Sequence, residues 1–313
     1  MISVIMSTYK EIINHLDKAI DSILSQTIQE IEFIIIVDDP TNNTLIDYIQ
    51  KKAREDSRIH YFVNDKNLGL AKSLNKAIQL SSGEYIARMD ADDISYLDRL
   101  ESELKLLKEN DLDLVGCNIV DIDEMGNILN SKGSNFPSSD KAIKLFLKTN
   151  SAIPHPTWLV KRELFFDLGM YKNFPAAQDY EFLTRVALSG KKFGNIISPK
   201  LNYRINTKGI SFTKKKLQKT IQYYVRYNYI RGKETSLEDF YKFYRSKEGK
   251  KKQENLRKYY IHSEKLKNYL RKKYYIKFLV EGIFTFIFSQ EARQVIYSIW
   301  REKLIKLYFG RNY

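Results

Sequence analysis

Short apolar runs alternate with amphipathic segments over roughly the first two thirds of the chain. Four of these runs are rich in β-branched and aromatic residues, which predicts strands at residues 2–7, 32–37, 59–63 and 84–89. Between and after them, leucine, isoleucine and alanine recur every three or four residues, which predicts helices at 16–24, 70–78 and 97–107. Alternating strands and helices are typical of an α/β fold with a largely parallel sheet.

The pattern changes after residue 112. Residues 112–129 hold two apolar runs around Met125, Gly126 and Asn127, which predicts a hairpin and therefore a mixed sheet. A helix is predicted over 179–190, with Gly190 as its C-terminal cap, followed by strands at 191–198 and 200–205. From residue 214 onward the apolar residues keep a helical spacing and glycine and proline are scarce, so the C-terminal region is expected to be α-helical.

Charge divides the 313-residue chain into two regions. Residues 1–213 hold 26 lysines and arginines against 29 acidic residues, whereas residues 214–313 hold 26 against 9. The second region also carries 14 of the 22 tyrosines. We therefore expect a domain boundary near residue 213, with a catalytic domain at 1–213 and a basic, tyrosine-rich helical region at 214–313.

The expected location follows from three features of the chain. Cys117 is the single cysteine, which excludes an intrachain disulfide and favours a reducing compartment. The N-terminus lacks the basic segment and cleavage site of a signal peptide, so it is interpreted as a strand. The longest apolar run near the other end, 278–288, contains Glu281 and is too short to cross a bilayer. A cytoplasmic protein, soluble or peripheral to a membrane, is expected.

Three carboxylates, Asp90, Asp92 and Asp93, follow the predicted strand 84–89 directly, and their charges repel unless a cation or hydrogen-bond donors lie among them. Ligands of open α/β sheets bind beyond the carboxyl ends of the strands. Mg²⁺ or Mn²⁺, held by a few carboxylates and by substrate phosphates, would supply the missing positive charge. Alternatively, Asp92 or Asp93 caps the following helix, and the aspartates before Pro40 form only a turn.

Five segments in order carry a resemblance to a known family: SVIMSTYKE, IEFIIIVDDPTNN, NLGLAKSLNKAIQLSSGEYIARMDADD, PHPTWLVKRELFFDLGMYK and AQDYEFLTRVALSG. Over roughly residues 1–205 the chain resembles family 2 glycosyltransferases, which are inverting enzymes dependent on nucleotide sugars. Their bacterial members build capsule, O-antigen and cell-wall polysaccharides. The resemblance implies the GT-A fold, a Rossmann-like, mainly parallel mixed sheet flanked by helices.

The resemblance also implies which residues bind the donor, expected to be a UDP-sugar. The expected nucleotide-sugar-binding residues are Thr8, Tyr9, Glu11, Asp39, Asn67, Lys72 and Asp90, and the expected metal ligand is Asp92 of the DXD motif. Three positions depart from the family pattern, since Lys10, Pro40 and Lys72 stand where asparagine, glycine and arginine are frequent. A lysine at 72 offers a point charge in place of a bidentate fork, which implies looser phosphate geometry.

Asp179 is the expected catalytic base, because it stands where the family has the base that deprotonates the acceptor hydroxyl. Gln178 replaces the more common glutamate, and Glu181 is expected at the surface or paired with a neighbour. The alternative for Asp179 is a plain helix cap. His155 and Trp158 match a segment that lines the acceptor side in the family, where Trp158 would stack on a sugar ring. The alternative for both is ordinary core packing.

The basic tail is argued from physical chemistry alone. Its clusters at 214–216, 247–252 and 271–275 favour attraction to anionic lipid, and tyrosine and Trp300 favour the membrane interface. Residues 276–288, followed by further apolar positions up to Trp300, are compatible with an interfacial helix. We therefore expect a peripheral enzyme on the inner face of the cell membrane, with a lipid-linked glycan acceptor. The alternative is a merely solvated charged surface.

Other classes of protein are compatible with parts of the sequence. A nucleic-acid-binding protein would use the basic aromatic tail to stack bases and pair with phosphates. A processive synthase of the same fold would need transmembrane helices and a Gln-x-x-Arg-Trp motif, which Trp158 and Trp300 do not provide. A catalytically dead sugar-binding module is a further alternative, and the presence of Asp39, Asp90, Asp92 and Asp179 argues against it. The glycosyltransferase is favoured, and nucleic acid is not an expected partner.

Overall fold

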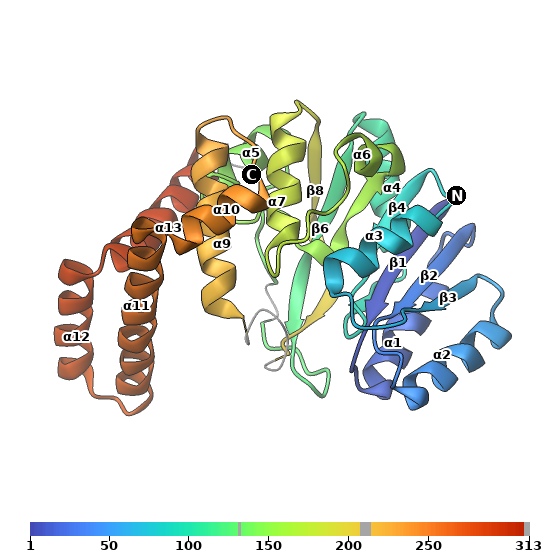
Figure 1. Ribbon diagram of the computed structural model, residues 1–313, viewed down its shortest axis with the longest axis horizontal. Coiled ribbons are helices and arrows are strands. Elements are labelled where there is room, and N and C mark those ends of the chain that lie inside the picture. Colours follow the sequence, from blue (N-terminus) through green and yellow to red (C-terminus); the bar gives the residue numbers. More distant parts are fainter. Residues whose placement is uncertain (131–132, 207–213, 310–313) are drawn as a thin grey trace.

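The computed structural model describes residues 1–130, 133–206 and 214–309 (Figure 1). One mixed sheet of eight strands crosses the molecule in the order β3-β2-β1-β4-β7-β6-β8-β5. The β1, β2, β3 and β4 strands are parallel neighbours, β6 and β8 are parallel, and β7 and β5 pair antiparallel. The strands are β1 Ile2–Thr8, β2 Ile31–Val37, β3 Ile59–Val63, β4 Tyr85–Arg88, β5 Ile94–Ser95, β6 Leu114–Ile122, β7 Leu159–Lys161 and β8 Phe193–Arg204.

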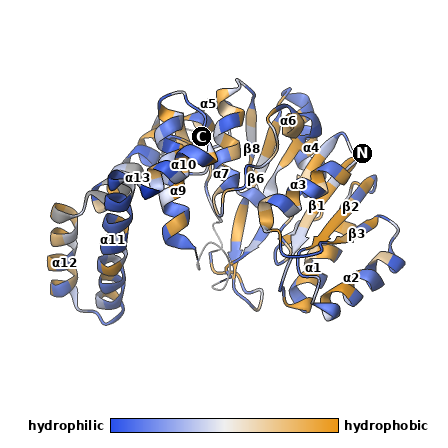
Figure 2. Cartoon of the chain, in the orientation of Figure 1, coloured by the Kyte–Doolittle hydropathy of each residue, from blue (hydrophilic) through white to orange (hydrophobic). Residues whose placement is uncertain are grey.

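Helices cover both faces of the sheet because alternate strand residues point to opposite sides. In β1, Val4 and Met6 pack on one side and Ile5 on the other. The first side carries α1 Ile13–Leu24, α2 Asn43–Glu55 and α4 Arg99–Glu109. The second carries α3 Leu70–Leu80, α5 Asp140–Phe146, α6 Arg162–Asp167 and α7 Gln178–Leu188, with a short 3-10 turn η1 at His155–Thr157. Figure 2 shows hydrophobic residues gathered on the strands between these layers.

The expected mixed, mainly parallel sheet is confirmed, with two local differences. The hairpin predicted over 112–129 is confirmed only at its tip, where Ile122 and Ile128 form one antiparallel bridge flanked by backbone hydrogen bonds from Asp123 to Asn127 and from Leu129 to Asp121. The main partner of β6 is β8 instead. The two strands predicted at 191–198 and 200–205 form the single strand β8, and the sheet accommodates Pro199 by a shift in register.

The C-terminal region is helical, as expected. Its helices are α9 Lys215–Ile230, α10 Leu237–Arg245, α11 Lys247–Arg271, α12 Tyr275–Phe288 and α13 Gln290–Phe309. Ile221 and Val225 of α9 and Phe240 of α10 join the apolar cluster beneath α3 and α7, so the first tail helices share a core with the sheet. The expected boundary near residue 213 therefore marks a change in charge and composition and not a separate core. The division into two domains stays a prediction.

The outer part of the tail is arranged differently. Helices α11 and α12 form an antiparallel pair at the far end of the molecule from β3, and α13 leads back toward α5 (Figure 1). Among the helices of the described residues, none combines the length and the apolar character needed to cross a membrane.

A buried acid, Glu103 of α4, lies in the core beside the sheet. Its side chain is fully buried, 4.0 Å from the Arg99 guanidinium. Burial raises the pKa of Glu103 to about 8, although Arg99, the Cys117 thiol and Lys200 act in the opposite direction. Because the ordinary value is 4.5, the folded state holds a proton that the unfolded chain releases. The protein therefore loses stability from this group as the pH rises from 4.5 to about 8.

Replacing Glu103 by glutamine is expected to remove this loss. The stability of the Glu103→Gln variant relative to the parent should grow by roughly 2–4 kcal/mol between pH 5 and pH 8. Urea unfolding at both pH values measures the difference, with Glu109→Gln on the exposed side of α4 as the control. A difference independent of pH would contradict a protonated Glu103.

Candidate active site

The carboxyl ends of β1, β2 and β4 meet at one edge of the sheet. The chain winds from β1 toward β2 and β3 in one direction, and β4 lies on the other side of β1. This reversal beside β1 is a topological switch point, where open α/β sheets bind their ligands. The segments that follow these three strands therefore border a common site.

The loop after β1 is folded around Glu11. The Oε2 atom of Glu11 accepts a hydrogen bond from Thr8 Oγ1 at 2.5 Å and another from the Tyr9 backbone N–H at 2.6 Å. Thr8 is thereby buried, whereas the Tyr9 ring is 38% exposed with Lys10 Nζ 4.8 Å from its centre. Of the three expected donor residues, Tyr9 is the exposed one, and Thr8 and Glu11 set the shape of the loop.

The two aspartates after β2, Asp38 and Asp39, accept hydrogen bonds from different parts of the chain. Asp38 accepts hydrogen bonds from the backbone N–H groups of Leu68 and Gly69, at 2.8 and 2.9 Å, and from the Asn64 side chain at 2.8 Å. It thus fixes the loop that leads into α3. Asp39 accepts from the Thr41 hydroxyl at 2.7 Å and lies beside the loop after β1 through β1–β2 pairing.

Asn67 and Lys72, both expected near the donor, have exposed side chains. Asn67 lies in the loop that Asp38 holds, and Lys72 lies in the first turn of α3. The sequence places Asp38 at the carboxyl end of a predicted strand, with a plain turn as the alternative, and does not predict its contact with the loop before α3. Its position thirty residues before the loop carries no local signal, and only the tertiary fold brings the two together.

A buried arginine lies beneath the carboxylates that follow β4. The Arg88 side chain is 2% exposed, and its Nη1 lies 2.5 Å from Asp90 Oδ1. A second arginine, Arg204 of β8, donates its backbone N–H to Asp93 Oδ1 at 2.7 Å and its Nε–H to the Asp92 carbonyl at 2.8 Å. Arg88 therefore supplies part of the positive charge that the sequence requires, and Arg204 supplies hydrogen-bond donors, while the metal ion stays a prediction.

The surroundings of Asp92 and Asp93 raise the pKa values of both carboxyl groups. Burial and the Asp90 charge raise the pKa of Asp92 to about 6, with a further contribution from Glu11. Burial together with both neighbours holds the pKa of Asp93 well above its ordinary range. Neither Asp92 nor Asp93 caps α4, whose N-cap position is Asp98, so the capping alternative is wrong.

Asp179 is the second residue of α7, so the simple N-cap alternative is wrong as well: the N-cap position is Ala177. Ala177 has φ 57° and ψ 27°, a left-handed conformation that costs energy in a residue with a Cβ. Burial raises the pKa of Asp179, while backbone N–H groups at the helix start and the Arg88 charge oppose this rise. The strained turn therefore aims a carboxylate from α7 toward the group around Arg88.

Tyr203 of β8 lies close enough to the site carboxylates for their charges to affect its hydroxyl. Its pKa is raised by burial and then by the charges of four carboxylates, those of Asp90, Asp93, Asp92 and Asp179. Tyr203 directly precedes Arg204, whose backbone N–H binds Asp93, so this part of β8 borders the loop after β4. Arg88 and Tyr203 were not identified from the sequence, because a buried arginine and a strand tyrosine have no local signature of a site.

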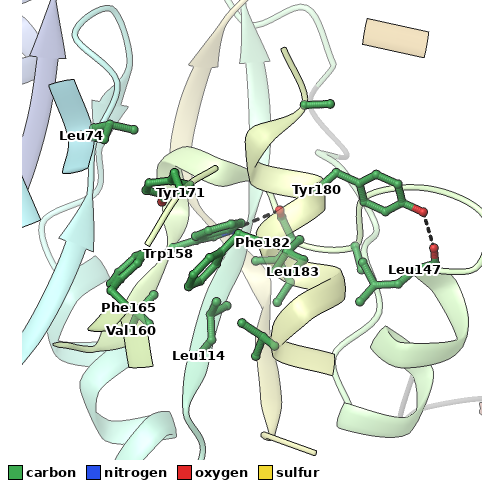
Figure 3. Close-up of a cluster of buried hydrophobic side chains, with 14 of the residues drawn as sticks. Leu74, Leu114, Leu147, Trp158, Val160, Phe165, Tyr171, Tyr180, Phe182 and Leu183 are labelled. Carbon is green, nitrogen blue, oxygen red and sulfur yellow. Dashed lines mark hydrogen bonds between the residues drawn. The ribbon is translucent and has the colours of Figure 1, made fainter. Parts of the chain in front are cut away.

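The aromatic residues beneath the site form a packed core. Trp158 is fully buried, stacks on Tyr171 with ring centres 6.3 Å apart, and donates its indole N–H to the Ile153 carbonyl (Figure 3). Its ring has no exposed face, so the expectation that it stacks on a sugar is wrong and the packing alternative holds. His155 is half-buried, with Nε2 2.9 Å from the Tyr171 hydroxyl, and burial and the Arg88 charge hold its pKa well below 6.5.

Glu181, one turn into α7, is fully buried and forms ion pairs with Arg185 at 2.8 Å and with Lys172 at 3.1 Å. The expectation of a surface position was wrong, and the expectation of a charged partner is confirmed. Its carboxylate is occupied by these partners, which leaves Asp179 as the carboxylate of α7 that faces the site.

Comparison with known proteins agrees with this arrangement. The model of glycosyl transferase family 2 matches residues 3–169. An uncharacterized glycosyltransferase of Methanocaldococcus jannaschii, MJ1057, is 35% identical over 72% of this chain and 77% of its own length. The O-antigen biosynthesis glycosyltransferase WbnJ of Escherichia coli is 30% identical over 66% of this chain and 81% of its own. The chain therefore belongs to glycosyl transferase family 2.

Solved structures share the fold at low sequence identity. Residues 1–349 of Staphylococcus aureus TarS superpose with a TM-score of 0.57 and 17% identity, covering 76% of this chain and 68% of that one. The mannosyltransferase PcManGT from Pyrobaculum calidifontis, in complex with GDP-Man and Mn²⁺, gives the same TM-score and identity over 76% of this chain and 66% of its own. This chain spans 37% of the longer TarS chain. The expected GT-A fold, with a helical C-terminal extension, is confirmed.

Proposed function

We propose that this glycosyltransferase is an inverting enzyme that moves a hexose or N-acetylhexosamine from a UDP-sugar to a hydroxyl of a lipid-linked glycan. The product would enter surface polysaccharide or glycoconjugate synthesis on the cytoplasmic side of the cell membrane. The observation that carries the proposal is the ion pair of buried Arg88 with Asp90, 2.5 Å long, at the carboxyl end of β4 beside the switch point of the sheet, together with the hydrogen bond from the Arg204 backbone N–H of β8 to Asp93. WbnJ, described as an O-antigen biosynthesis enzyme, supports the polysaccharide context.

The donor nucleotide would lie between the loops after β1 and β2. The exposed Tyr9 ring offers a face for the base, and Asp39 offers a carboxylate to a base N–H. TarS has been solved with UDP-GlcNAc, which favours UDP, and PcManGT has been solved with GDP-Man. Asn67 and Lys72 would reach the ribose or the phosphates from the loop that Asp38 holds.

Asp92 is the proposed ligand of Mn²⁺ or Mg²⁺, with Asp90 beside it on the ribose or sugar. The described residues hold no cluster of three or more histidine, cysteine, aspartate or glutamate side chains suited to a metal ion. One or two carboxylates are nevertheless sufficient for an ion that takes its other ligands from substrate phosphates. The buried Asp93 Oδ2, which has no hydrogen-bond partner in the described chain, shows unused acceptor capacity there. The bound ion would offset charge on the departing diphosphate.

Asp179 is the proposed general base. Its carboxylate would accept the proton of the acceptor hydroxyl while the hydroxyl oxygen attacks the anomeric carbon. The new carbon–oxygen bond forms on the face opposite the bond to the diphosphate, which inverts the anomeric configuration. The Arg88 charge favours the ionised form that this role requires.

A thermal-shift screen with nucleotide sugars tests the donor and metal assignments. A UDP-sugar with Mn²⁺ at about one hundred times its Kd should stabilise the protein by roughly 2.7 kcal/mol, which raises the Tm by about 5 °C. GDP-sugars and samples containing EDTA should give smaller shifts. The Asp92→Ala variant should lose the metal-dependent part of the shift.

Asp47→Ala, on the exposed surface of α2, serves as the matched control and should keep the full shift. If Asp92→Ala responds to UDP-sugar and Mn²⁺ as the parent does, Asp92 is not the metal ligand. If GDP-sugars stabilise the parent more than UDP-sugars do, the assignment of UDP as the donor nucleotide is wrong.

A further inference from the structure

Helix α12 presents an uninterrupted apolar surface to solvent. Seven of its apolar residues share one broad side of the helix, and each side chain is between 44% and 80% exposed: Tyr275, Ile276, Leu279, Val280, Ile283, Phe286 and Ile287. We call this the α12 apolar face. It lies on the outer helix of the α11–α12 pair, at the end of the molecule (Figure 1).

The opposite side of α12 carries the polar groups. Glu281 turns toward α11, where its Oε1 lies 2.5 Å from His262 Nδ1, and Thr285 is buried with its hydroxyl bonded to the Glu281 carbonyl. A helix at a water-exposed surface normally buries its apolar side and exposes its polar side. In α12 the apolar side is exposed, and Glu281 and Thr285 are on the side that packs on α11. Exposure of the α12 apolar face to water is therefore unfavourable. Large exposed apolar patches mark contacts with a membrane or a partner.

Charge around the face favours a membrane with anionic lipids. Arg271, Lys272 and Lys273 are exposed at the turn between α11 and α12, and Lys277 is exposed one turn into α12. No acidic residue occurs in the sequence between Glu264 and Glu281. Two copies joined through this face would bring like charges together, whereas a lipid surface carrying phosphates and carboxylates would attract them.

We infer that α12 lies in the headgroup region of an anionic membrane, with its apolar face toward the acyl chains. Apolar residues on one side, with lysine, arginine and tyrosine at the border, define a helix that lies on a bilayer. In Figure 1 α12 is the outermost helix at this end of the molecule, on the side of α11 away from the sheet, so a membrane could contact it without obstruction by the sheet. The consequence for the acceptor, a glycan on a lipid carrier, rests on the proposed function, whereas the membrane contact does not.

Vesicle co-sedimentation of the full chain tests the inference. The parent should bind phosphatidylcholine vesicles that contain phosphatidylserine and should be partly released by salt. The double variant Ile276→Glu, Ile283→Glu should bind at least about tenfold more weakly, because two large side chains no longer enter the apolar layer. The double variant Lys272→Gln, Lys273→Gln should bind these vesicles roughly thirtyfold more weakly, while keeping the weaker binding to phosphatidylcholine alone.

The matched control replaces two exposed isoleucines outside α12, as Ile197→Glu with Ile230→Glu, and should bind vesicles like the parent. Equal vesicle binding by the parent and the Ile276→Glu, Ile283→Glu variant would overturn the inference. So would light scattering that shows a dimer of the parent and a monomer of that variant without lipid, because the face would then be covered by a second copy. The parent and the Ile276→Glu, Ile283→Glu variant should show the same Tm shift with UDP-sugar. This second measurement distinguishes failure of the membrane inference from failure of the proposed function.

Discussion

Replacing Asp179 by asparagine is expected to lower kcat for sugar transfer about a thousandfold, the usual contribution of a positioned general base. Asparagine has nearly the same shape and keeps the contacts at the start of α7, but it cannot take a proton from the acceptor hydroxyl. Donor binding should change little, because the donor is assigned to the loops after β1, β2 and β4. Initial rates of transfer and the Tm shift with UDP-sugar and Mn²⁺ measure the two properties separately.

The Asp167→Asn variant, altered at an exposed position in α6, is the control and should transfer sugar at the parental rate. Because burial raises the pKa of Asp179, the activity of the parent should begin to fall, as the pH is lowered, above the range in which exposed aspartates titrate. An Asp179→Asn variant that keeps a tenth or more of the parental rate would show that another group takes the proton.

Removing the buried charge of Arg88 is expected to have the largest effect on stability. The Arg88→Met variant should lose about 3 kcal/mol of unfolding free energy at pH 8, since the ion pair with the partly buried Asp90 is broken and the buried Asp92 and Asp93 lose the charge that favours their ionised forms. The loss should be smaller at pH 5. Without Arg88 the folded-state pKa values of Asp92 and Asp93 rise further, so protonation at low pH relieves the repulsion that remains at high pH.

Urea unfolding at the two pH values gives the required comparison. Arg54→Met, in an exposed position of α2, controls for the loss of an arginine as such and should be near neutral. Arg88→Lys keeps the charge and should recover part of the loss. If Arg88→Met loses the same free energy at both pH values, the side chain contributes by packing and the electrostatic account of the site fails.

The sequence predicts the parts of this fold that depend on local patterns. The four apolar runs became β1 to β4 because β-branched and aromatic side chains fit a sheet covered on both sides. Gly190 lies in the left-handed region with φ 80°, as expected of a residue that ends a helix. Helix α2 was not predicted, although Leu45 and Ile49 lie one turn apart and Asn42 caps its first turn by accepting from the Leu45 N–H.

Other features depend on contacts between distant positions and leave no local pattern. Arg204 meets Asp92 and Asp93 across 112 and 111 positions of the chain. The burial of Trp158 depends on Tyr171 and Phe182, which arrive from later elements. The resemblance to a family identified the carboxylates, but it did not distinguish a residue that touches substrate from one that holds such a residue in place. For Trp158 that distinction needed the fold.

The isolation of Cys117 within the core makes the protein suited to site-specific labelling. This single thiol is fully buried on β6, and burial raises its pKa well above the ordinary value, so it reacts poorly with maleimides. A cysteine introduced at Lys273, in the exposed turn beyond α11, would therefore take up a fluorophore or a spin label alone. Quenchers placed at chosen depths in a vesicle would then read how closely that turn approaches the lipid.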